Sequence, residues 1–475
     1  MPLQGLLGRR RIGGKQRRSP IPIQHVIIVG SLIIVALYAA GLLMIVGKGH
    51  SVAPSSENQA VVEKTNAPMR SKVDGSVDAG SNGRFGKDAN PATQPVQMLS
   101  STTDAETIGW AVTITGCGSD PITEGAAVLK HAVHLTSIHG NGRYNYKMYA
   151  IYHPDGEACA LTLKDLGYEL IQRETPVAVK DIEGKFLREK IESNGCCGEK
   201  ELVKLEAYTL TEHPVVVHLD LDVVVLKPMD ALFDMMMAKS PDDWDTINVP
   251  IMWPEKSLPE KVNAFFTRDY NMVGPGRTYK PVQGGFLVLR PDMKVYEEFV
   301  RIIKKGIDKE GTGWGGIVGP FYGFMTFQGL IPYYYDVLHD NEAIELSRCI
   351  YNQMADNPKD KRTINDIPQG RCRTNQEECE DCRNRPLEDV VSAHFTLCQK
   401  PWLCLPQDSD IIQLRLCRKL HHQWYRIRSD LEQSWGREAF GNGTYQKDHF
   451  FGFCTKHGKL GYLDIEKPYG APIPK

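Results

Sequence analysis

Two aspartates separated by one residue, Asp220 and Asp222, are the best candidates for chemistry in this sequence. They lie between two apolar, β-branched runs, 215–217 and 223–226, and this pattern predicts a buried central strand that ends in Asp-x-Asp. A carboxylate in a buried strand is costly unless it is paired, protonated or bound to a metal, and two acids at one strand end can share a divalent cation. We therefore expect a metal site at this strand end.

A second group of candidates lies downstream in the sequence His-Phe-Thr-Leu-Cys-Gln-Lys-Pro-Trp, residues 394–402. The imidazole of His394 is a candidate third metal ligand, and Lys400 is suited to neutralise a phosphate as a point charge. For either residue alone, a core histidine or a solvated lysine is the more ordinary explanation. Their significance therefore depends on a link to the two aspartates.

The elements that must position these residues alternate between strands and helices. The predicted strands are 110–115, 146–152, 168–172, 282–289 and 390–397; the predicted helices are 124–138, 159–166, 199–210, 229–233, 293–305 and 408–435, with 327–338 partly helical. This order predicts an α/β fold with a mixed, mostly parallel sheet flanked by helices. In such sheets ligands bind beyond the carboxyl ends of the strands, where Asp220 and Asp222 fall.

Irregular segments are expected around this pocket. The stretch 242–280 contains tryptophans and prolines without periodicity, and it predicts a loop-rich wall for the substrate. The glycine-rich stretch 311–319 predicts an ordinary loop, with a phosphate or sugar contact as the alternative. Within the strand 282–289, the pair Gly284-Gly285 would let another group approach the backbone closely.

The N-terminal part of the chain predicts a membrane anchor. The uncharged stretch from Val26 to Gly47 is long enough to cross a bilayer as a helix, and the basic, acid-free residues before it favour a cytosolic tail. A cleaved signal peptide is the alternative, but the apolar stretch is longer than the core of most such peptides. The polar stretch that follows predicts a flexible stem. We expect a single-pass type II protein whose remaining residues face a lumen.

Charge and cysteine content narrow the class of protein further. The formal net charge of −2 gives no nucleic-acid signature. In a lumen the twelve cysteines favour disulfides over zinc, although Cys372, Cys379 and Cys382 have metal-like spacing. Further bridges, of open pairing, are expected to involve Cys196, Cys197, Cys398, Cys404 and Cys417. The single glycosylation sequon begins at Asn442.

The acid pair and the downstream segment together resemble the glycogenin-like glycosyltransferases, family 8 of the nucleotide-sugar enzymes. That family combines an Asp-x-Asp strand with a distant His-x5-Lys-Pro-Trp, and His394, Lys400, Pro401 and Trp402 match this spacing. The resemblance covers roughly 110–402. It is more specific than either segment alone, because both motifs occur in the expected order.

Further residues that precede the acid pair are similar to the same family. Lys204 lies sixteen residues before Asp220 in a Lys-Leu-x-x-aromatic-x-Leu-Thr helix. A strand that contains Thr113 and Thr115, followed by Gly125 on the next helix, resembles the family's uridine-binding start. The resemblance thus extends upstream of the acid pair as well as downstream to Trp402.

The resemblance implies a GT-A fold, a UDP-sugar donor, a Mn²⁺ or Mg²⁺ ion and transfer with retention of anomeric configuration. Asp220 and Asp222 would bind the metal, with His394 as the third protein ligand and Asp220 also near the ribose. Lys400 would contact the diphosphate, and Lys204 would lie near the phosphate and the donor sugar. Because the leaving group is a diphosphate, a cation and two lysines can stabilise its charge without a general acid.

The sequence also departs from the family pattern at positions near the donor. Phe327 stands where the family often has the aspartate of Asp-Gln-Gly, Gln283 stands where it has an asparagine, and Ile122 replaces a tyrosine that stacks on uracil. Without the acid at 327, we expect front-face departure and attack rather than an enzyme-bound intermediate. Gln283 or Gln328 would then bond the sugar.

These features predict a Golgi enzyme that moves a hexose or related sugar from a UDP-sugar to a glycan, polysaccharide or protein acceptor, with a homodimer as an open arrangement. The expected parts are a cytosolic tail, an anchor, a stem, a GT-A domain and a C-terminal helical extension, at 1–25, 26–47, 48–107, 108–405 and 406–475.

Two other classes of protein are weighed against this prediction. The sequence from Asp220 to Val224 fits the D-x-D-x-[TV] nucleophile motif of haloacid-dehalogenase-type phosphatases. That motif normally opens its domain, whereas three predicted strands precede it here. A non-catalytic luminal scaffold with the same fold is the second alternative, suggested by the missing acid and tyrosine. Retention of both aspartates, His394 and both lysines favours the enzyme.

Overall fold

The computed structural model describes residues 105–118, 122–254, 256–360, 370–404, 412–436, 449–450 and 454–455. The chain divides into two compact units, Met1–Pro95 and Val96–Lys475, and every described residue belongs to the second. The predicted tail, the predicted anchor, nearly all of the stem and the sequon at Asn442 lie outside the described residues. Among the residues that are described, no helix is both long and apolar enough for a membrane crossing.

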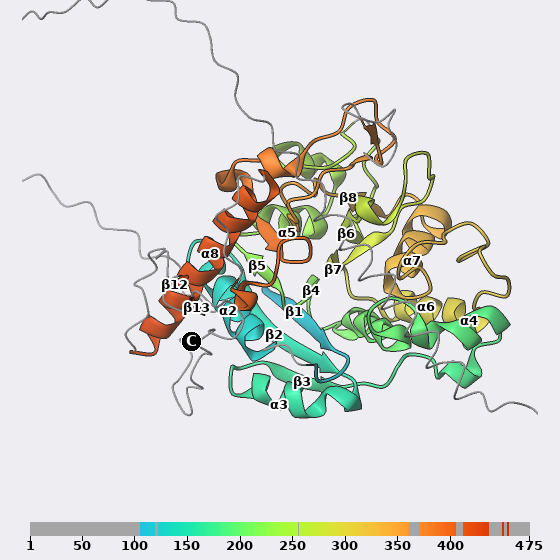
Figure 1. Cartoon of the computed structure of the whole chain (residues 1–475), viewed down its shortest axis with the longest axis horizontal. Coiled ribbons are helices and arrows are strands. Elements are labelled where there is room, and N and C mark those ends of the chain that lie inside the picture. Colours follow the sequence, from blue (N-terminus) through green and yellow to red (C-terminus); the bar gives the residue numbers. More distant parts are fainter. Residues whose placement is uncertain are drawn as a thin grey trace, which may run out of the picture. The chain divides into compact units, whose positions relative to one another are not determined.

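A seven-stranded sheet forms the centre of this unit, in the order β3-β2-β1-β4-β7-β6-β8 (Figure 1). Its strands are β1 (Thr107–Ile114), β2 (Asn145–Tyr152), β3 (Glu169–Gln172), β4 (Val216–Leu219), β6 (Ala264–Arg268), β7 (Val282–Leu289) and β8 (Ala343–Glu345). The pairs β1–β2, β2–β3, β1–β4 and β6–β8 are parallel, and only β7 runs antiparallel to both of its neighbours. The predicted mixed, mostly parallel sheet is confirmed.

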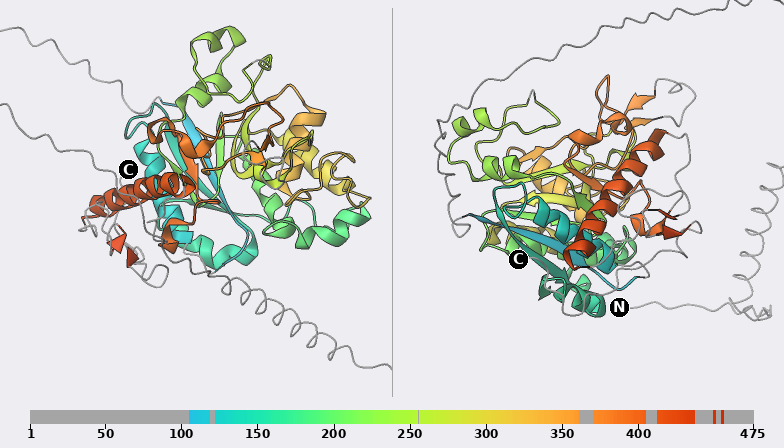
Figure 2. Two further views of the ribbon diagram at one scale, coloured as in Figure 1. Left: turned by 45° about the horizontal axis from the view of Figure 1, so that its top comes forward. Right: turned by 90° about the vertical axis from the view of Figure 1, so that its left-hand side faces the viewer.

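Helices cover both faces of the sheet (Figures 1 and 2). They are α2 (Ile122–Leu135), α3 (Glu157–Lys164), α4 (Lys185–Lys190), the 3₁₀ helix η4 (Gly198–Thr209), α5 (Asp230–Met237), α6 (Met293–Lys305), α7 (Phe327–Tyr333) and α8 (Ile412–Ser434). The predicted helices agree, except that 199–210 is a 3₁₀ helix. A turn of π helix at Tyr334–Leu338 extends α7.

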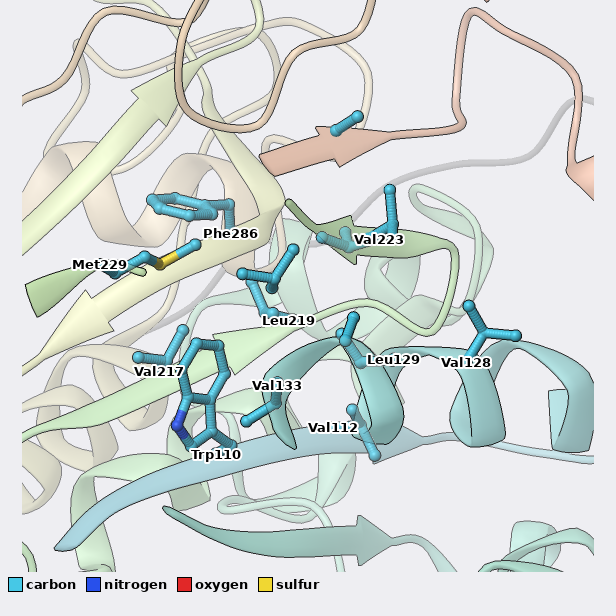
Figure 3. Packing of buried hydrophobic residues seen from close by; sticks show 14 of the residues in the cluster. Trp110, Val112, Val128, Leu129, Val133, Val217, Leu219, Val223, Met229 and Phe286 are labelled. Atoms are coloured by element: carbon cyan, nitrogen blue, oxygen red, sulfur yellow. The ribbon is translucent and has the colours of Figure 1, made fainter. Parts of the chain in front are cut away.

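Two hydrophobic cores lie on opposite faces of the sheet, and the strands divide their side chains between them. On β1, Trp110 and Val112 belong to one core and Ala111 to the other, while on β4 Val217 and Val216 divide in the same way. This follows from the two-residue period of a strand. Figure 3 shows the first core, in which side chains of β1 and β4 pack against α2.

The predicted buried central strand is confirmed as β4, which ends directly before Asp220, but the second apolar run forms a separate strand. The strand β4 ends at Leu219, and β5 (Val223–Val225) pairs antiparallel with β11 (Ser392–His394) in a separate two-stranded sheet. Between them the chain turns, and the Val223 amide donates to the Asp220 carbonyl at 3.2 Å. Both acids therefore lie at the junction of two sheets, next to the strand that carries His394.

Two other expectations change. The predicted loop-rich wall 242–280 contains β6, a fully buried strand that pairs with β7 and β8. The sequence did not reveal it, because a five-residue strand within irregular chain gives little periodic signal. The predicted strand 390–397 shortens to β11.

The C-terminal helix α8 packs against the sheet-bearing part of the chain, where Arg428 Nη1 lies 3.5 Å from Glu124 Oε2 on α2.

Disulfides account for the cysteines with metal-like spacing. Cys372 pairs with Cys379 and Cys382 with Cys349, which confirms disulfides over zinc. The other bonded cysteines of the described chain are Cys117, Cys159, Cys398, Cys404 and Cys417. Cys196 and Cys197 are the two free cysteines of the described residues, so their predicted bridges are wrong. A disulfide between these two neighbours is also disfavoured, because adjacent Cα atoms lie about 3.8 Å apart across a trans peptide, which is closer than an ordinary disulfide prefers.

Candidate functional site

One cavity of about 340 Å³ brings together the residues that the sequence singled out. It lies beyond the carboxyl ends of β1 and β4, where an α/β sheet is expected to hold its ligand. The predicted site residues that line it are Thr113, Thr115, Lys204, Asp220, Asp222, Gln283, Gln328, His394 and Lys400. Every predicted site residue is therefore placed in one cavity, although these residues come from six separate stretches of the chain.

Asp220, Asp222 and His394 converge at one point of the cavity. Their ligand atoms all lie within 4.8 Å of one another, with His394 Nε2 at 3.2 Å from Asp222 Oδ1 and 4.0 Å from Asp220 Oδ2. His394 is 3% exposed and Asp222 is 9% exposed. Two carboxylates and an imidazole held this close, with Asp222 and His394 buried and Asp220 partly exposed, fit the oxygen and nitrogen donors that suit Mn²⁺.

A lysine flanks each of the two aspartates. Lys204 Nζ donates to Asp220 Oδ1 and to the carbonyl of Gly284, both at 2.9 Å, and Lys400 donates to Asp222. Burial acts to lower the pKa of Lys204, but Asp220 and Glu201 raise this pKa more, so the net pKa lies above that of an ordinary lysine. Both lysines place positive charge beside the acid pair.

Neighbouring positive charges also keep the Asp222 carboxyl ionised. Burial acts to raise the pKa of Asp222, but His394 and Lys400 lower this pKa more, so the net pKa falls below that of an ordinary aspartate. Asp222 is therefore a carboxylate at neutral pH, which is the form that binds a cation.

Two glycines allow the elements of the site to approach one another. A Cβ on Gly285 of β7 would lie 2.4 Å from His394 Cε1 and 2.8 Å from Asp220 Oδ2. A Cβ on Gly125 of α2 would lie 2.4 Å from the carbonyl oxygen of Leu221, between the two acids. Neither distance is compatible with a side chain, so both positions require glycine, as the close approach expected at 284–285 suggested.

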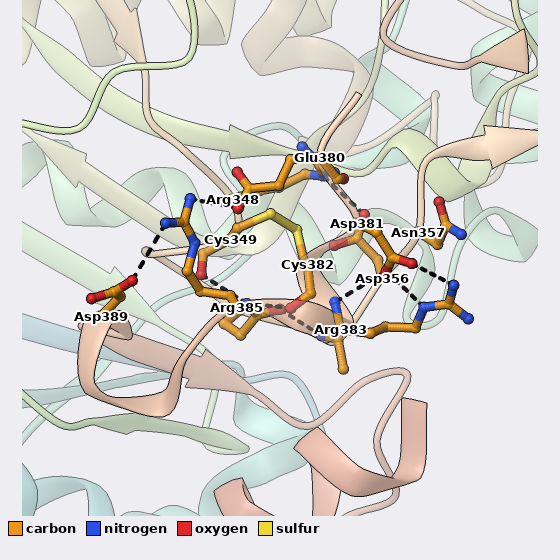
Figure 4. The surroundings of a disulfide bond; sticks show 12 residues. Arg348, Cys349, Asp356, Asn357, Glu380, Asp381, Cys382, Arg383, Arg385 and Asp389 are labelled. Carbon is orange, nitrogen blue, oxygen red and sulfur yellow. Dashed lines mark hydrogen bonds and ion pairs between the residues drawn. A yellow bond between two sulfur atoms is a disulfide. The ribbon is translucent and has the colours of Figure 1, made fainter. Parts of the chain in front are cut away.

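A disulfide-linked segment supports His394 through a backbone hydrogen bond. Cys349 is bonded to Cys382, and beside it the buried Arg348 Nε donates to Asp356 Oδ2 at 2.9 Å (Figure 4). Within this segment the carbonyl of Gln353 accepts from the His394 amide at 3.0 Å. The position of β11 thus depends on a loop that is cross-linked covalently and by charge.

The two predicted glutamines both line the cavity near Gly284. Gln283 Oε1 accepts from the Gly285 amide at 2.6 Å and from Asn352 Nδ2 at 3.3 Å. A Cβ on Gly284 would lie 3.3 Å from Gln328 Cγ. The carbonyl oxygen of Gln283 is thus already occupied, whereas Gln328 lies directly against the part of β7 that faces the cavity.

The other end of the cavity is formed by β1 and the start of α2. Thr113 Oγ1 lies 2.8 Å from Nε2 of the buried His218, and Thr115 and Ile122 also line the cavity. Burial, and then the charge of Lys204, lower the pKa of His218 to about 3, so this imidazole is neutral at physiological pH.

Several residues of the cavity were not predicted as site residues. They are Cys196, Cys197, Glu201, Asp269, Met272 and Tyr322, among others. Burial, followed by repulsion from Asp356, raises the pKa of Asp269 to about 6. The expected wall 242–280 contributes Asp269 and Met272 to the described lining, and 311–319 contributes none of it. Sequence spacing gave no signal for Glu201, because a glutamate three residues before a lysine is common on exposed helices.

Comparisons with known proteins give weak similarities to solved structures. No family model and no curated protein sequence matches the chain. Mouse xyloside xylosyltransferase 1 is 12% identical with a TM-score of 0.36, over 62% of this chain and 99% of that one. An active-site mutant of LgtC is 13% identical with a TM-score of 0.33, over 67% and 95%. The glycosyltransferase GlyE of Streptococcus pneumoniae TIGR4 is 12% identical with a TM-score of 0.35, over 69% and 63%. At these values the similarities do not assign a function to this chain.

Proposed function

We propose that this protein is a metal-dependent glycosyltransferase that moves a hexose or related sugar from a UDP-sugar to a glycan, polysaccharide or protein acceptor. The observation that carries the proposal is the convergence of Asp220, Asp222 and His394 in one cavity, with Lys204 and Lys400 on either side. This set combines a cation site with two ammonium groups. A diphosphate is the leaving group that such a set suits best.

The three converging residues would hold Mn²⁺, or Mg²⁺ in its place. A divalent cation bound there supplies positive charge to the departing diphosphate. Lys204 and Lys400 add fixed charge from the protein itself, and their contacts with the two carboxylates keep both ammonium groups at the site. No general acid is needed, because UDP leaves as an anion.

The remaining lining residues divide the cavity between the two halves of a donor. Thr113, Thr115 and Ile122 would face the uridine, and Gln328 would bond the transferred sugar near Gly284. Retention of anomeric configuration, with departure and attack on one face of the sugar, follows from the family resemblance. It accords with the buried Phe327, which places no carboxylate at its position.

A Golgi location with a single-pass type II anchor at 26–47 is part of the proposal. The disulfides of the described chain support an oxidising compartment for this part of the protein. A membrane-bound dimer is compatible with the anchor and stem, and it is left open.

A panel of UDP-sugars tests the proposed function. The full-length chain, purified in detergent, is incubated with each donor and with Mn²⁺, Mg²⁺ or EDTA, and released UDP is measured. We expect UDP release from one donor or a few related ones, which requires the divalent cation. Release of inorganic phosphate from phosphorylated substrates, without UDP release from any donor, would favour the phosphatase alternative instead.

A further inference from the structure

A fourth acidic residue, Glu201 on η4, lines the same cavity as the proposed metal ligands. It is 4% exposed, and it lies beside Lys204, which also contacts Asp220. The Glu201 Oε1–Lys204 Nζ distance is 3.7 Å, against 2.9 Å for Lys204 Nζ–Asp220 Oδ1. A carboxylate this buried is costly unless its oxygens have partners.

The two oxygens of Glu201 are in different situations. Oε2 accepts a hydrogen bond from Thr326 Oγ1 at 2.5 Å, and the Thr326 side chain is itself fully buried. Within the described residues, no hydrogen bond reaches Oε1, whose nearest charged partner is Lys204 at ion-pair distance. The threonine therefore fixes the carboxylate, and it leaves Oε1 directed at the cavity.

The position of Oε1 relates it to one part of the cavity. A Cβ on Gly284 would lie 3.3 Å from Gln328 Cγ, 3.5 Å from Glu201 Oε1 and 3.5 Å from Lys204 Nζ. These three side chains thus surround the same point of β7. Lys204 links Glu201 to the proposed metal ligands, because its ammonium lies at ion-pair distance from both Asp220 and Glu201. In the proposed function, a group beyond the diphosphate in this direction would be the sugar of the donor.

We propose that Glu201 binds hydroxyl groups of the transferred sugar and thereby selects neutral sugars over uronic acids. This inference rests on the proposed function. A carboxylate oxygen accepts hydrogen bonds from sugar hydroxyls, and such charge-assisted bonds are stronger than neutral ones. A uronic acid would bring a second carboxylate towards the same buried charge, which costs free energy at low effective dielectric.

The test compares the full-length wild type with Glu201→Gln, Thr326→Val and the control Glu192→Gln. Glu192 is an exposed glutamate of the neighbouring 3₁₀ helix Ile191–Ser193. Calorimetry with UDP and Mn²⁺ reports the diphosphate clamp without a sugar, and steady-state kinetics with the accepted UDP-sugar reports the sugar contact. The same kinetics with UDP-glucuronate report selection by charge.

We expect Glu201→Gln to keep UDP affinity within about threefold and to lose about 10- to 100-fold in kcat/KM for the neutral donor, as expected for a lost hydrogen bond to a charged group. The preference for neutral donor over UDP-glucuronate should narrow in this variant. Thr326→Val keeps the charge but frees the carboxylate, so its loss should be smaller. Glu192→Gln should match the wild type.

Three results would overturn the assignment. Equal kcat/KM in wild type and Glu201→Gln would show that Glu201 does not touch the sugar. A parallel loss of UDP binding in Glu201→Gln and Thr326→Val would show a role in the architecture of the pocket. An unchanged preference against UDP-glucuronate would remove the charge selection. Failure of the wild type to bind UDP would contradict the proposed function itself, and the role of Glu201 with it.

Discussion

Lys204 and Asp220 form an ion pair with 2.9 Å between Nζ and Oδ1, and the same Nζ donates to the carbonyl of Gly284 at 2.9 Å. One ammonium group therefore joins η4, the end of β4 and the middle of β7. Because the pKa of Lys204 is raised by Asp220 and Glu201 against the effect of burial, this residue is a fixed positive charge. Its position supports Asp220 and, in the proposed function, would let it contact a phosphate.

Lys204→Met should weaken UDP binding. The variant removes the ammonium but keeps an unbranched side chain, so we expect the Kd for UDP with Mn²⁺ to rise about 10- to 100-fold. Calorimetry on the full-length protein measures this change. The exposed Lys190 of α4 gives the control Lys190→Met, which should bind UDP as the wild type does. An unchanged Kd in Lys204→Met would exclude Lys204 from the phosphate site.

Replacement of two neighbouring glycines by alanine should change Mn²⁺ affinity to different extents. In Gly285→Ala the new methyl would lie 2.4 Å from His394 Cε1 and 2.8 Å from Asp220 Oδ2, so Mn²⁺ binding should fall by at least about tenfold. In Gly284→Ala the closest atom is Gln328 Cγ at 3.3 Å, so Mn²⁺ binding should be nearly unchanged. Mn²⁺ titration followed by electron paramagnetic resonance distinguishes the two. Equal Mn²⁺ affinities would contradict the proposed geometry.

The buried His218 should make stability depend on pH. Its pKa is lowered from 6.5 to about 3 in the folded protein, chiefly by burial, so between these values the unfolded chain binds a proton that the folded chain does not. The contribution of His218 is present above pH 6.5 and is lost as pH falls towards 3. Near pH 5 it should change the free energy of unfolding by about 1.4 kcal/mol per pH unit.

Chemical denaturation of His218→Gln at pH 6 and pH 5 checks this contribution. The slope of the unfolding free energy against pH should be smaller in the variant by about 1.4 kcal/mol per pH unit, which is the contribution of one proton. Other buried histidines, such as His421 with a pKa near 4, retain their part in both proteins. An identical pH dependence in variant and wild type would show that His218 does not stay neutral in the fold.

The free cysteines provide a probe of cavity occupancy. Cys196 and Cys197 line the cavity, and the hydrogen bond from Cys196, with one from Thr115, lowers the pKa of Cys197 to about 7 against the effect of burial. N-ethylmaleimide should therefore label the peptide that contains both cysteines at neutral pH. UDP-sugar with Mn²⁺ at ten times Kd should slow labelling about tenfold, because about one molecule in eleven is unliganded.

Mass spectrometry of that peptide measures the protection. Mn²⁺ alone and UDP-sugar with EDTA are the controls, and neither should protect as well as the complete mixture. A labelling rate that is unaffected by the complete mixture would place the ligand outside this cavity.

Local patterns predicted much of the fold. The apolar residues of Val282–Leu289 and the helical periodicity within Met293–Lys305 gave β7 and α6 with the bounds that the structure has, because each signal lies within its own element. The break between β4 and β5 gave no such signal. Both flanking runs are apolar and buried, and the change of sheet depends on pairing with β11, which is distant in sequence.

The site was predicted where residue types are characteristic, and it was missed where only tertiary packing gives a residue its role. Asp220, Asp222 and His394 belong to recognisable spacings, whereas Glu201 is one of several charged residues in a polar helix. Its burial and its hydrogen bond from Thr326 distinguish it from an exposed glutamate. Gln283 or Gln328 was expected to bond a sugar, and of these the carbonyl oxygen of Gln283 already accepts from Gly285 and Asn352.

The proposed function requires that the two aspartates hold a cation for the UDP-sugar reaction. UDP release from the accepted donor by wild type, Asp222→Asn and the control Asp308→Asn, each with Mn²⁺ and with EDTA, tests it most directly. Asp308 is exposed, so Asp308→Asn changes the same charge outside the cavity. We predict Mn²⁺-dependent release by wild type and Asp308→Asn, and a loss of at least about 100-fold in Asp222→Asn. Equal Mn²⁺-dependent release by wild type and Asp222→Asn would contradict the account.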